Sequence, residues 1–220
     1  IKAVLFARGG YGGVRIIDRL DFKKFKKDPK WIIGFSDATV FHSHINENYR
    51  VATIHSKMCN SFPSDWNGAE QVQKDAIESI RECLSGKKME YSVVPSKNNK
   101  TGTAKGQLVG GNLRILETLA GSNSDIITEN KILFLEDLDE YLYHVDRMMM
   151  NLKRTGKLKS LKGLVVGGMS DMKDNSIPFG KSAEEIILDA VREFDYPVCF
   201  GFNAGHISEN NPLVLGRKVK

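Results

Sequence analysis

The sequence predicts an α/β fold of two lobes, an N-terminal lobe with a mostly parallel sheet flanked by helices and a C-terminal α/β lobe. Short apolar runs alternate with amphipathic helical stretches along most of the 220 residues, which is the pattern of a parallel sheet covered on both faces. A polar stretch at residues 95–102 interrupts this alternation and separates the lobes. A chain of this length can bury a sizeable core.

The N-terminal lobe, residues 1–64, is predicted to contain three strands. Apolar runs at residues 2–6, 31–33 and 51–54 supply them. Helices are expected between these runs, around residues 14–20 and at about residues 38–46. The lobe therefore follows a strand–helix rhythm from its first residues.

A connector, residues 65–104, is predicted to follow. Val72, Ile77 and Ile80 keep helical spacing and predict a helix over residues 69–84. Gly86 lies just past its end, where a C-cap glycine is expected. The polar residues 95–102 are expected to form a loop.

The C-terminal lobe, residues 105–220, resumes the alternation. Strands are predicted at residues 132–135, 164–166 and 198–202. Helices are expected through Ile115 and Leu119, and at residues 141–152 and 183–194.

Composition excludes several classes of protein. The net charge is +5 and the pI near 9.0, but the lysines are scattered without interleaved aromatic residues, so we predict no nucleic-acid partner. No apolar run approaches the roughly 20 residues that span a bilayer, so no membrane association is expected. The contents of 41% hydrophobic and 27% charged residues are those of an ordinary globular protein.

Cysteines and the chain start bear on the compartment. Cys59, Cys83 and Cys199 lie far apart, which indicates reduced thiols rather than a disulfide framework or a zinc site. The sequence enters an apolar stretch at Ile1, without the charged region or cleavage site of a signal peptide. We predict a cytoplasmic protein, and we expect that an upstream segment of the natural protein is missing from this sequence.

The sharpest local feature is a serine between a predicted strand and a predicted helix. Gly34 and Ala38 are small residues that flank Ser36 at two positions' distance, as a cramped strand-to-helix turn requires. Such a turn exposes the serine hydroxyl and aims the next backbone N–H groups at one point, where an oxyanion is stabilised. The alternative is that Ser36 or Asp37 caps the helix, since both residue types favour that position.

A glycine-rich turn, residues 7–13, follows the first predicted strand. Four glycines in five positions let the backbone approach a ligand and offer bare N–H donors. A dinucleotide fingerprint is excluded because Arg15 stands where the third glycine would be needed. The turn either supplies a second oxyanion donor or binds substrate backbone, or is a plain tight turn.

Carboxylates gather at the end of the strand predicted at residues 132–135. Glu136 and Asp137 lie at the edge where open α/β sheets bind ligands. Asp139 and Glu140 compete for the same role, but we expect them to stabilise the start of the following helix.

Among the five histidines, His206 follows a predicted strand in a loop, a common place for a catalytic imidazole. His55 also follows a strand and is the competing base. His42 and His44 lie two residues apart on a predicted helix, so they cannot face one ligand together. His144 is expected on a helix surface. A metal site would need tighter clustering, and we predict none.

These motifs, in this order, resemble the LD-carboxypeptidase family, which includes murein tetrapeptide carboxypeptidases and microcin C immunity-type serine peptidases. The stretches that carry the resemblance are ARGGYGGVRIIDRLD, IIGFSDAT, TIH, GQLVGGNL, LFLEDLDEYLYHVDRMM and the closing GFNAGH…PLVLG. They cover nearly the whole chain, apart from the connector. Ser56 and Lys57 depart from the family, in which Gly-Pro often follows the histidine.

The resemblance implies a serine peptidase with Ser36 as nucleophile, His206 as base and Glu136 orienting the base, without metal or organic cofactor. It implies backbone oxyanion donors at Asp37 and in the glycine turn, at Gly10 with Gly9 beside it. Arg8 is our candidate for the substrate's terminal carboxylate, with a structural ion pair as the alternative.

The activity that the resemblance implies is removal of the terminal D-alanine from murein tetrapeptides during cell-wall recycling, by a homodimer. One alternative is hydrolysis of microcin C-type peptide-nucleotides or acyl-sulfamoyl adenylates, for which Trp66 could stack on a nucleobase. Another is a binding module without enzymatic activity, whose glycine loop cradles an anion.

Overall fold

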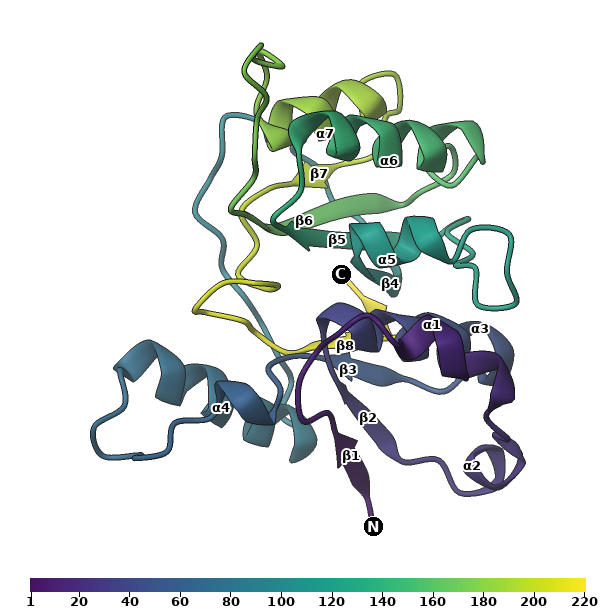
Figure 1. The fold of residues 1–220 in the computed structure, drawn as a ribbon, viewed down its shortest axis with the longest axis vertical. Helices are drawn as coiled ribbons and strands as arrows, with labels where there is room; N and C mark the ends of the chain where they lie inside the picture. The colour runs from purple at the N-terminus through teal and green to yellow at the C-terminus, as the bar shows by residue number, and fades with distance from the viewer.

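The computed structural model describes residues 1–220 and shows two sheets, one in each of two lobes (Figure 1). The strand order in the first sheet is β1-β2-β3-β8, and β8 is its only antiparallel member. Its strands are β1 (Ala3–Leu5), β2 (Trp31–Gly34), β3 (Thr53–His55) and β8 (Leu213–Leu215).

Helices follow the strands of the first lobe. Three α-helices lie there, α1 (Gly13–Ile16), α2 (Lys23–Lys27) and α3 (Thr39–Tyr49), and α4 (Gln71–Leu84) follows in the predicted connector. Three 3₁₀ turns accompany them, η1 (Ile17–Arg19), η2 (Ser36–Ala38) and η3 (Cys59–Ser61). Helix α4 projects from the side of the molecule (Figure 1), and Gly86 follows it with a φ of +86°, as expected for a C-cap glycine.

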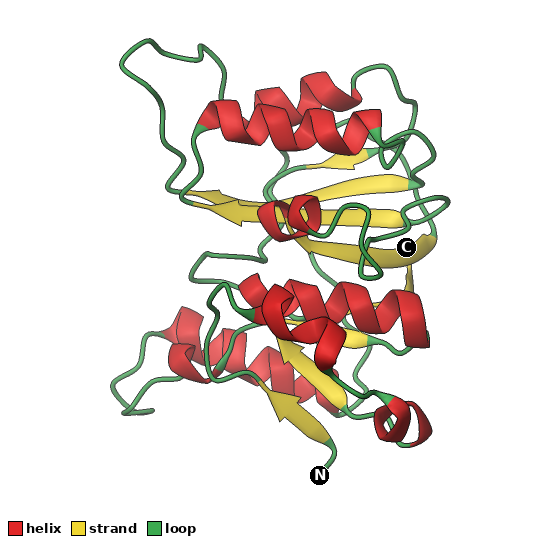
Figure 2. Cartoon of the chain, turned by 45° about the vertical axis from the view of Figure 1, so that its right-hand side comes forward, coloured by secondary structure: helices red, strands yellow, loops and turns green.

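The second sheet has the order β7-β6-β5-β4-β9. Its strands are β4 (Gly106–Asn112), β5 (Ile132–Leu138), β6 (Gly163–Ser170), β7 (Val198–Cys199) and β9 (Lys218–Val219). Its helices are α5 (Leu113–Thr118), α6 (Leu142–Arg154) and α7 (Ala183–Val191). Helices α6 and α7 lie side by side against this sheet (Figures 1 and 2).

The predicted fold class is confirmed: both lobes are α/β, with mostly parallel strands flanked by helices. The main core, a cluster of 22 buried residues, lies between the second sheet and helices α5 to α7. A smaller cluster of six combines five residues of the first lobe, among them the fully buried Val40 and Ile45 of α3, with Leu119 of the second lobe. None of the helices is both long enough and apolar enough to cross a bilayer.

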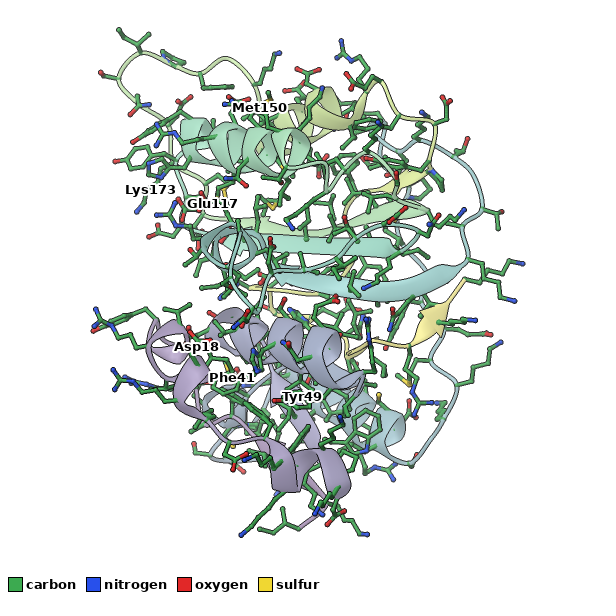
Figure 3. The ribbon with its side chains drawn as sticks, turned by 90° about the vertical axis from the view of Figure 1, so that its right-hand side faces the viewer. Asp18, Phe41, Tyr49, Glu117, Met150 and Lys173 are labelled. Atoms are coloured by element: carbon green, nitrogen blue, oxygen red, sulfur yellow. The ribbon has the colours of Figure 1, made fainter.

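A polar face of α3 joins the lobes. Thr39 Oγ1 accepts a hydrogen bond from the backbone N–H of Asn112 at 3.1 Å, and the Glu47 carboxylate pairs with Lys131 at 2.9 Å. The His44 ring lies 2.9 Å from the Ser124 hydroxyl. Figure 3 shows α3, marked by Phe41 and Tyr49, below α5, marked by Glu117. Helix α3, which begins directly after the predicted serine turn, is therefore fixed against the second lobe.

Several features of the sheets were not predicted, among them strand β4 and the end of β7 at Cys199. Strand β6 continues through Gly167 and Gly168 to Ser170 instead of ending at Val166, as predicted. Strands β8 and β9 come from the last residues described and pair with β3 and β4. The division into residues 1–64, 65–104 and 105–220 stays a prediction, while the structure adds that β8, far along the chain, completes the first sheet.

Candidate active site

Ser36 adopts a backbone conformation that a serine rarely takes. Its φ is +60°, in the left-handed region, directly after the extended residue Phe35. For a residue other than glycine this costs on the order of 1–3 kcal/mol and is found at functional turns. The hydroxyl caps neither η2 nor α3, so helix capping does not account for the serine at this position.

The glycine-rich turn packs directly on Ser36. A Cβ atom at Gly9 would lie 3.1 Å from Ser36 Oγ, so a larger residue would crowd the hydroxyl. The backbone N–H of Gly13 donates to the Asp37 carboxylate at 2.9 Å, which ties the start of α1 to η2. The side chain of Asp37 therefore serves α1, and not its own helix.

Gly10 and Arg8 lie on the outer part of this turn. Both are exposed. The Arg8 guanidinium makes neither an ion pair nor a side-chain hydrogen bond, so the alternative of a structural ion pair does not describe it.

Glu136 lies at the carboxyl end of β5, completely buried. Its Oε2 atom is 2.7 Å from Nδ1 of His206, and its Oε1 atom is 4.0 Å from Nε2 of His55. The β5–β6 register shifts beside it, between Leu135 and Asp137. Such an irregularity re-aims a side chain at a sheet edge.

The His206 loop is held against Glu136 by its own glycine and by two hydrogen bonds. Gly205 has a φ of +111°, and a Cβ atom there would lie 2.7 Å from Glu136 Cβ, so only glycine lets the loop approach this closely. Ser170 Oγ donates to the His206 carbonyl at 2.8 Å, and the Gly205 N–H donates to Asn210 Oδ1 at 3.0 Å. The imidazole is thereby fixed relative to the acid.

The charges of this pair reinforce each other. Burial opposes ionisation of Glu136, but the hydrogen bond from His206 and the nearby imidazoles of His206 and His55 outweigh it and hold its pKa at about 2. Burial also opposes a charged His206, yet the hydrogen bond and charge of Glu136 raise the pKa of that imidazole above its ordinary 6.5. A carboxylate that orients an imidazole and stabilises its protonated form behaves in this way.

The structure brings His206 to the serine turn through Phe35. The two rings have centroids 4.7 Å apart, and Phe35 directly precedes Ser36. No hydrogen bond joins Ser36 Oγ to His206 in this structure. Catalytic hydrogen bonds often tighten only when substrate is bound.

The other carboxylates near Glu136 have structural partners. Asp137 is buried and accepts hydrogen bonds from the Asn112 amide and from the backbone N–H groups of Arg114 and Leu138. Burial raises its pKa to about 6. Glu140 lies 2.9 Å from the His144 ring and Asp139 pairs with Lys173 at 2.6 Å.

The remaining histidines also have places that sequence alone did not assign. His42 is buried and its Nε2 lies 2.9 Å from the Gly34 carbonyl, and burial lowers its pKa to about 3. His55 is fully buried beside Glu136 and faces the carboxylate oxygen that does not contact His206, Oε1. No group of three or more histidine, cysteine or acidic side chains is arranged to hold a metal ion. Sequence reasoning weighed His55 only as a competing base and gave no role to Asn112, Ser170 or Asn210.

Fold and site together define the class of α/β proteins that combine a serine on a strand-to-helix turn with a histidine–carboxylate pair. Residues 1–56 match the LD-carboxypeptidase N-terminal domain, and residues 105–220 match the LD-carboxypeptidase C-terminal domain. The chain belongs to the LD-carboxypeptidase family.

Relatives of known sequence are similar over nearly the whole chain. A probable murein peptide carboxypeptidase of Bacillus subtilis is 33% identical over 221 residues, which cover 100% of this chain and 68% of the relative. The murein tetrapeptide carboxypeptidase of Pseudomonas aeruginosa is 26% identical, covering 99% of this chain and 71% of the relative. This chain thus spans about two thirds of the length of these relatives.

Solved structures agree. The muramoyltetrapeptide carboxypeptidase of Oxalobacter formigenes superposes with a TM-score of 0.85 at 29% identity, covering 99% of this chain and 72% of that one. The structure of MccF in complex with glutamyl sulfamoyl guanosine has a TM-score of 0.81 at 20% identity over the same shares, which shows a common fold.

Proposed function

We propose that this chain is the catalytic part of a serine carboxypeptidase that removes the terminal D-alanine from murein tetrapeptides. The observation that carries the proposal is the contact of 2.7 Å between His206 and the buried carboxylate of Glu136, together with a serine in a left-handed turn. Relatives named for murein peptides at up to 33% identity support the substrate class. Cytoplasmic location and a homodimer stay predictions.

In the proposed reaction His206 accepts the proton of Ser36 as the hydroxyl attacks the carbonyl carbon that precedes the terminal D-alanine. Glu136 stabilises the imidazolium that forms. The imidazolium then protonates the leaving amine of D-alanine, and water hydrolyses the acyl-enzyme by the same base. The free hydroxyl of Ser36 and the raised pKa of His206 both support this sequence of steps.

The tetrahedral oxyanion is assigned to backbone donors on the two sides of Ser36. The first N–H groups of a helix have no intrahelical partner, and Asp37 occupies such a position in η2. The turn at Gly9 and Gly10 lies against the serine and offers the second donor. Each such donor is typically worth about 3 kcal/mol in the transition state.

The exposed Arg8 guanidinium is proposed to bind the terminal carboxylate of the peptide. It stands one residue from the turn that contacts Ser36 and is not engaged in an ion pair. A planar guanidinium can bind a carboxylate through two parallel hydrogen bonds.

A second candidate function is hydrolysis of peptide-nucleotide conjugates. The fold shared with MccF favours it, and Trp66 is exposed, as a residue that stacks on a nucleobase would need to be. The two candidates use the same serine and differ in the leaving group.

The deciding experiment measures release of D-alanine from L-Ala-γ-D-Glu-meso-diaminopimelate-D-Ala by the full-length protein and by its Ser36→Ala variant. We expect release by the wild type and a loss of roughly 10⁴-fold or more in the variant. Ser182→Ala is the matched control, because it removes an exposed serine hydroxyl from the other lobe.

Three other outcomes have distinct meanings. Release unaffected by Ser36→Ala would exclude Ser36 as nucleophile. Release only from an acyl-sulfamoyl adenylate would select the second candidate. No hydrolysis of either substrate, with no labelling of Ser36 by a fluorophosphonate, would favour the alternative of an anion-binding module without enzymatic activity.

A further inference from the structure

We propose that His55 is a positioning residue that donates a hydrogen bond to the second oxygen of Glu136 and thereby ties the acid of the second lobe to the nucleophile's sheet. This inference rests on the proposed function. It assigns to His55 a role different from the competing base considered on sequence grounds.

The first support is a set of unpartnered polar atoms. His55 is completely buried, and both of its ring nitrogens lack a hydrogen-bond partner. Oε1 of Glu136 is buried and lacks one as well. Buried polar groups of this kind nearly always have a hydrogen-bond partner. Nε2 of His55 and Oε1 of Glu136 lie 4.0 Å apart. If this distance shortened by about 1 Å, Nε2 of His55 would donate an ordinary hydrogen bond to Oε1 of Glu136.

The second support is the packing that aims the ring. The His55 ring lies edge-on to Phe134, with centroids 5.0 Å apart, and to Phe35 at 5.9 Å. Phe134 belongs to β5, two residues before Glu136, and Phe35 directly precedes Ser36. The imidazole is thus held between the residues that lead to the acid and those that lead to the nucleophile.

The third support is strand register. His55 is paired with Gly34 of β2 in the first sheet, two residues before Ser36. Glu136 belongs to β5 of the second sheet. A hydrogen bond between His55 and Glu136 therefore crosses from one sheet to the other, and it fixes the distance between nucleophile and acid.

The same geometry argues against His55 as the base. A base must reach the substrate, and the side chain of His55 has no exposed surface, whereas that of His206 is 14% exposed. With His206 on Oε2 and His55 on Oε1, the carboxylate has a donor on each oxygen and cannot rotate freely. The titratable groups that face it are His206 from the loop and His55 from β3, with His42 of α3 behind His55 at a centroid distance of 6.5 Å. Asp137, the next residue of β5, adds a second acidic group whose charge also favours a protonated His206.

The test compares His55→Leu with His55→Gln in the full-length protein. Leucine removes the donor and keeps an apolar side chain, while the glutamine amide nitrogen can take the place of Nε2. The readout is the rate of Ser36 labelling by a fluorophosphonate across pH, because this does not depend on which peptide is the substrate. His44→Leu is the control, a buried histidine that bonds Ser124 instead of Glu136.

We expect His55→Leu to lower the labelling rate by about 10–100-fold, as loss of an orienting partner does at other sites. We also expect it to move the midpoint of the pH profile to lower pH, since a loosely held Glu136 raises the pKa of His206 less. His55→Gln should recover most of the rate and the midpoint. His44→Leu should lower thermal stability without moving the midpoint.

A wild-type rate and midpoint in His55→Leu would overturn the proposal, as would equal losses in both His55 variants with an unchanged midpoint, which is the signature of packing alone. If His55→Leu does not fold, His55→Asn replaces it, because its shorter amide does not reach Oε1. Failure of the wild type to react with the probe would instead refute Ser36 as an activated nucleophile.

Discussion

Two serines lie at the start of helices in this protein, and they differ in backbone conformation and in hydrogen bonding. Ser182 precedes α7 with an ordinary φ of −73°, and its hydroxyl accepts from the Glu185 N–H while the Glu185 carboxylate accepts from the Ser182 N–H. This is a complete capping box. Ser36 precedes α3 with a φ of +60° and makes no capping bond. One serine stabilises its helix, whereas the other is strained and leaves its hydroxyl free.

The difference shows what separates a structural serine from a candidate nucleophile. Both residues have the composition of an N-cap, and sequence alone leaves either role open for Ser36. The backbone angle and the hydroxyl's partners separate the two roles. Backbone strain at a residue that lies beside a glycine turn and an acid–base pair is typical of a functional site.

The largest effect that tests this contrast is expected from Glu136→Gln. An amide cannot stabilise the imidazolium of His206, so fluorophosphonate labelling of Ser36 should fall by roughly 10³–10⁴-fold. The wild-type rate should rise as pH increases through a midpoint above 6.5, because His206 must be neutral to act as base and Glu136 raises its pKa. In the variant the midpoint should move down. Unchanged labelling would mean that Ser36 is not activated by this pair.

A smaller effect is expected from Ser182→Ala. Loss of the capping box should lower the free energy of unfolding by about 1 kcal/mol, measured by urea denaturation. Labelling of Ser36 should be unchanged, because α7 lies outside the candidate site. A loss of labelling without a loss of stability would show that the two helix starts are coupled.

The smallest effect on stability is expected from Ser36→Gly. Glycine adopts positive φ without strain, so the free energy of unfolding should rise by up to about 1 kcal/mol, less the entropy that glycine costs. Reaction with the probe should vanish. A clear destabilisation in urea would indicate that the hydroxyl contributes to the fold, and the contrast with Ser182 would then fail.

Most of the fold was predictable because most of its strands and helices are indicated by the residue pattern of their own segment. The apolar runs at residues 31–33 and 132–135 became β2 and β5, and the periodic stretch at 69–84 became α4. Strands β8 and β9 were not predicted, because three and two residues carry no periodicity of their own and pair only with strands far away in sequence. The extension of β6 past Gly167 depends likewise on pairing with another strand, because Met169 and Ser170 lie opposite Asp137 and Leu138 of β5.

The candidate site was predictable to a different degree. Ser36 and His206 stand in local patterns that indicate a turn and a loop, and the family resemblance selected Glu136 among four carboxylates. The place of His55 was not predictable, since no local signal tells which oxygen of a distant carboxylate a buried imidazole faces. Asp137 was not assigned for the same reason, because its partners Asn112 and Arg114 lie on another strand and helix.

Residues 213–219 determine when the first sheet is completed during synthesis of the chain. Leu213 to Leu215 pair with β3, and Lys218 and Val219 pair with β4, so one short segment is bonded to both sheets. Gly216 between them donates to the Leu108 carbonyl at 2.7 Å. During synthesis the strands around Ser36 emerge before β8 and keep an unpaired edge at β3 until residue 215 is available. The nucleophile turn is thus encoded early and its sheet is completed late, so a growing chain has its reactive serine before it has a finished site.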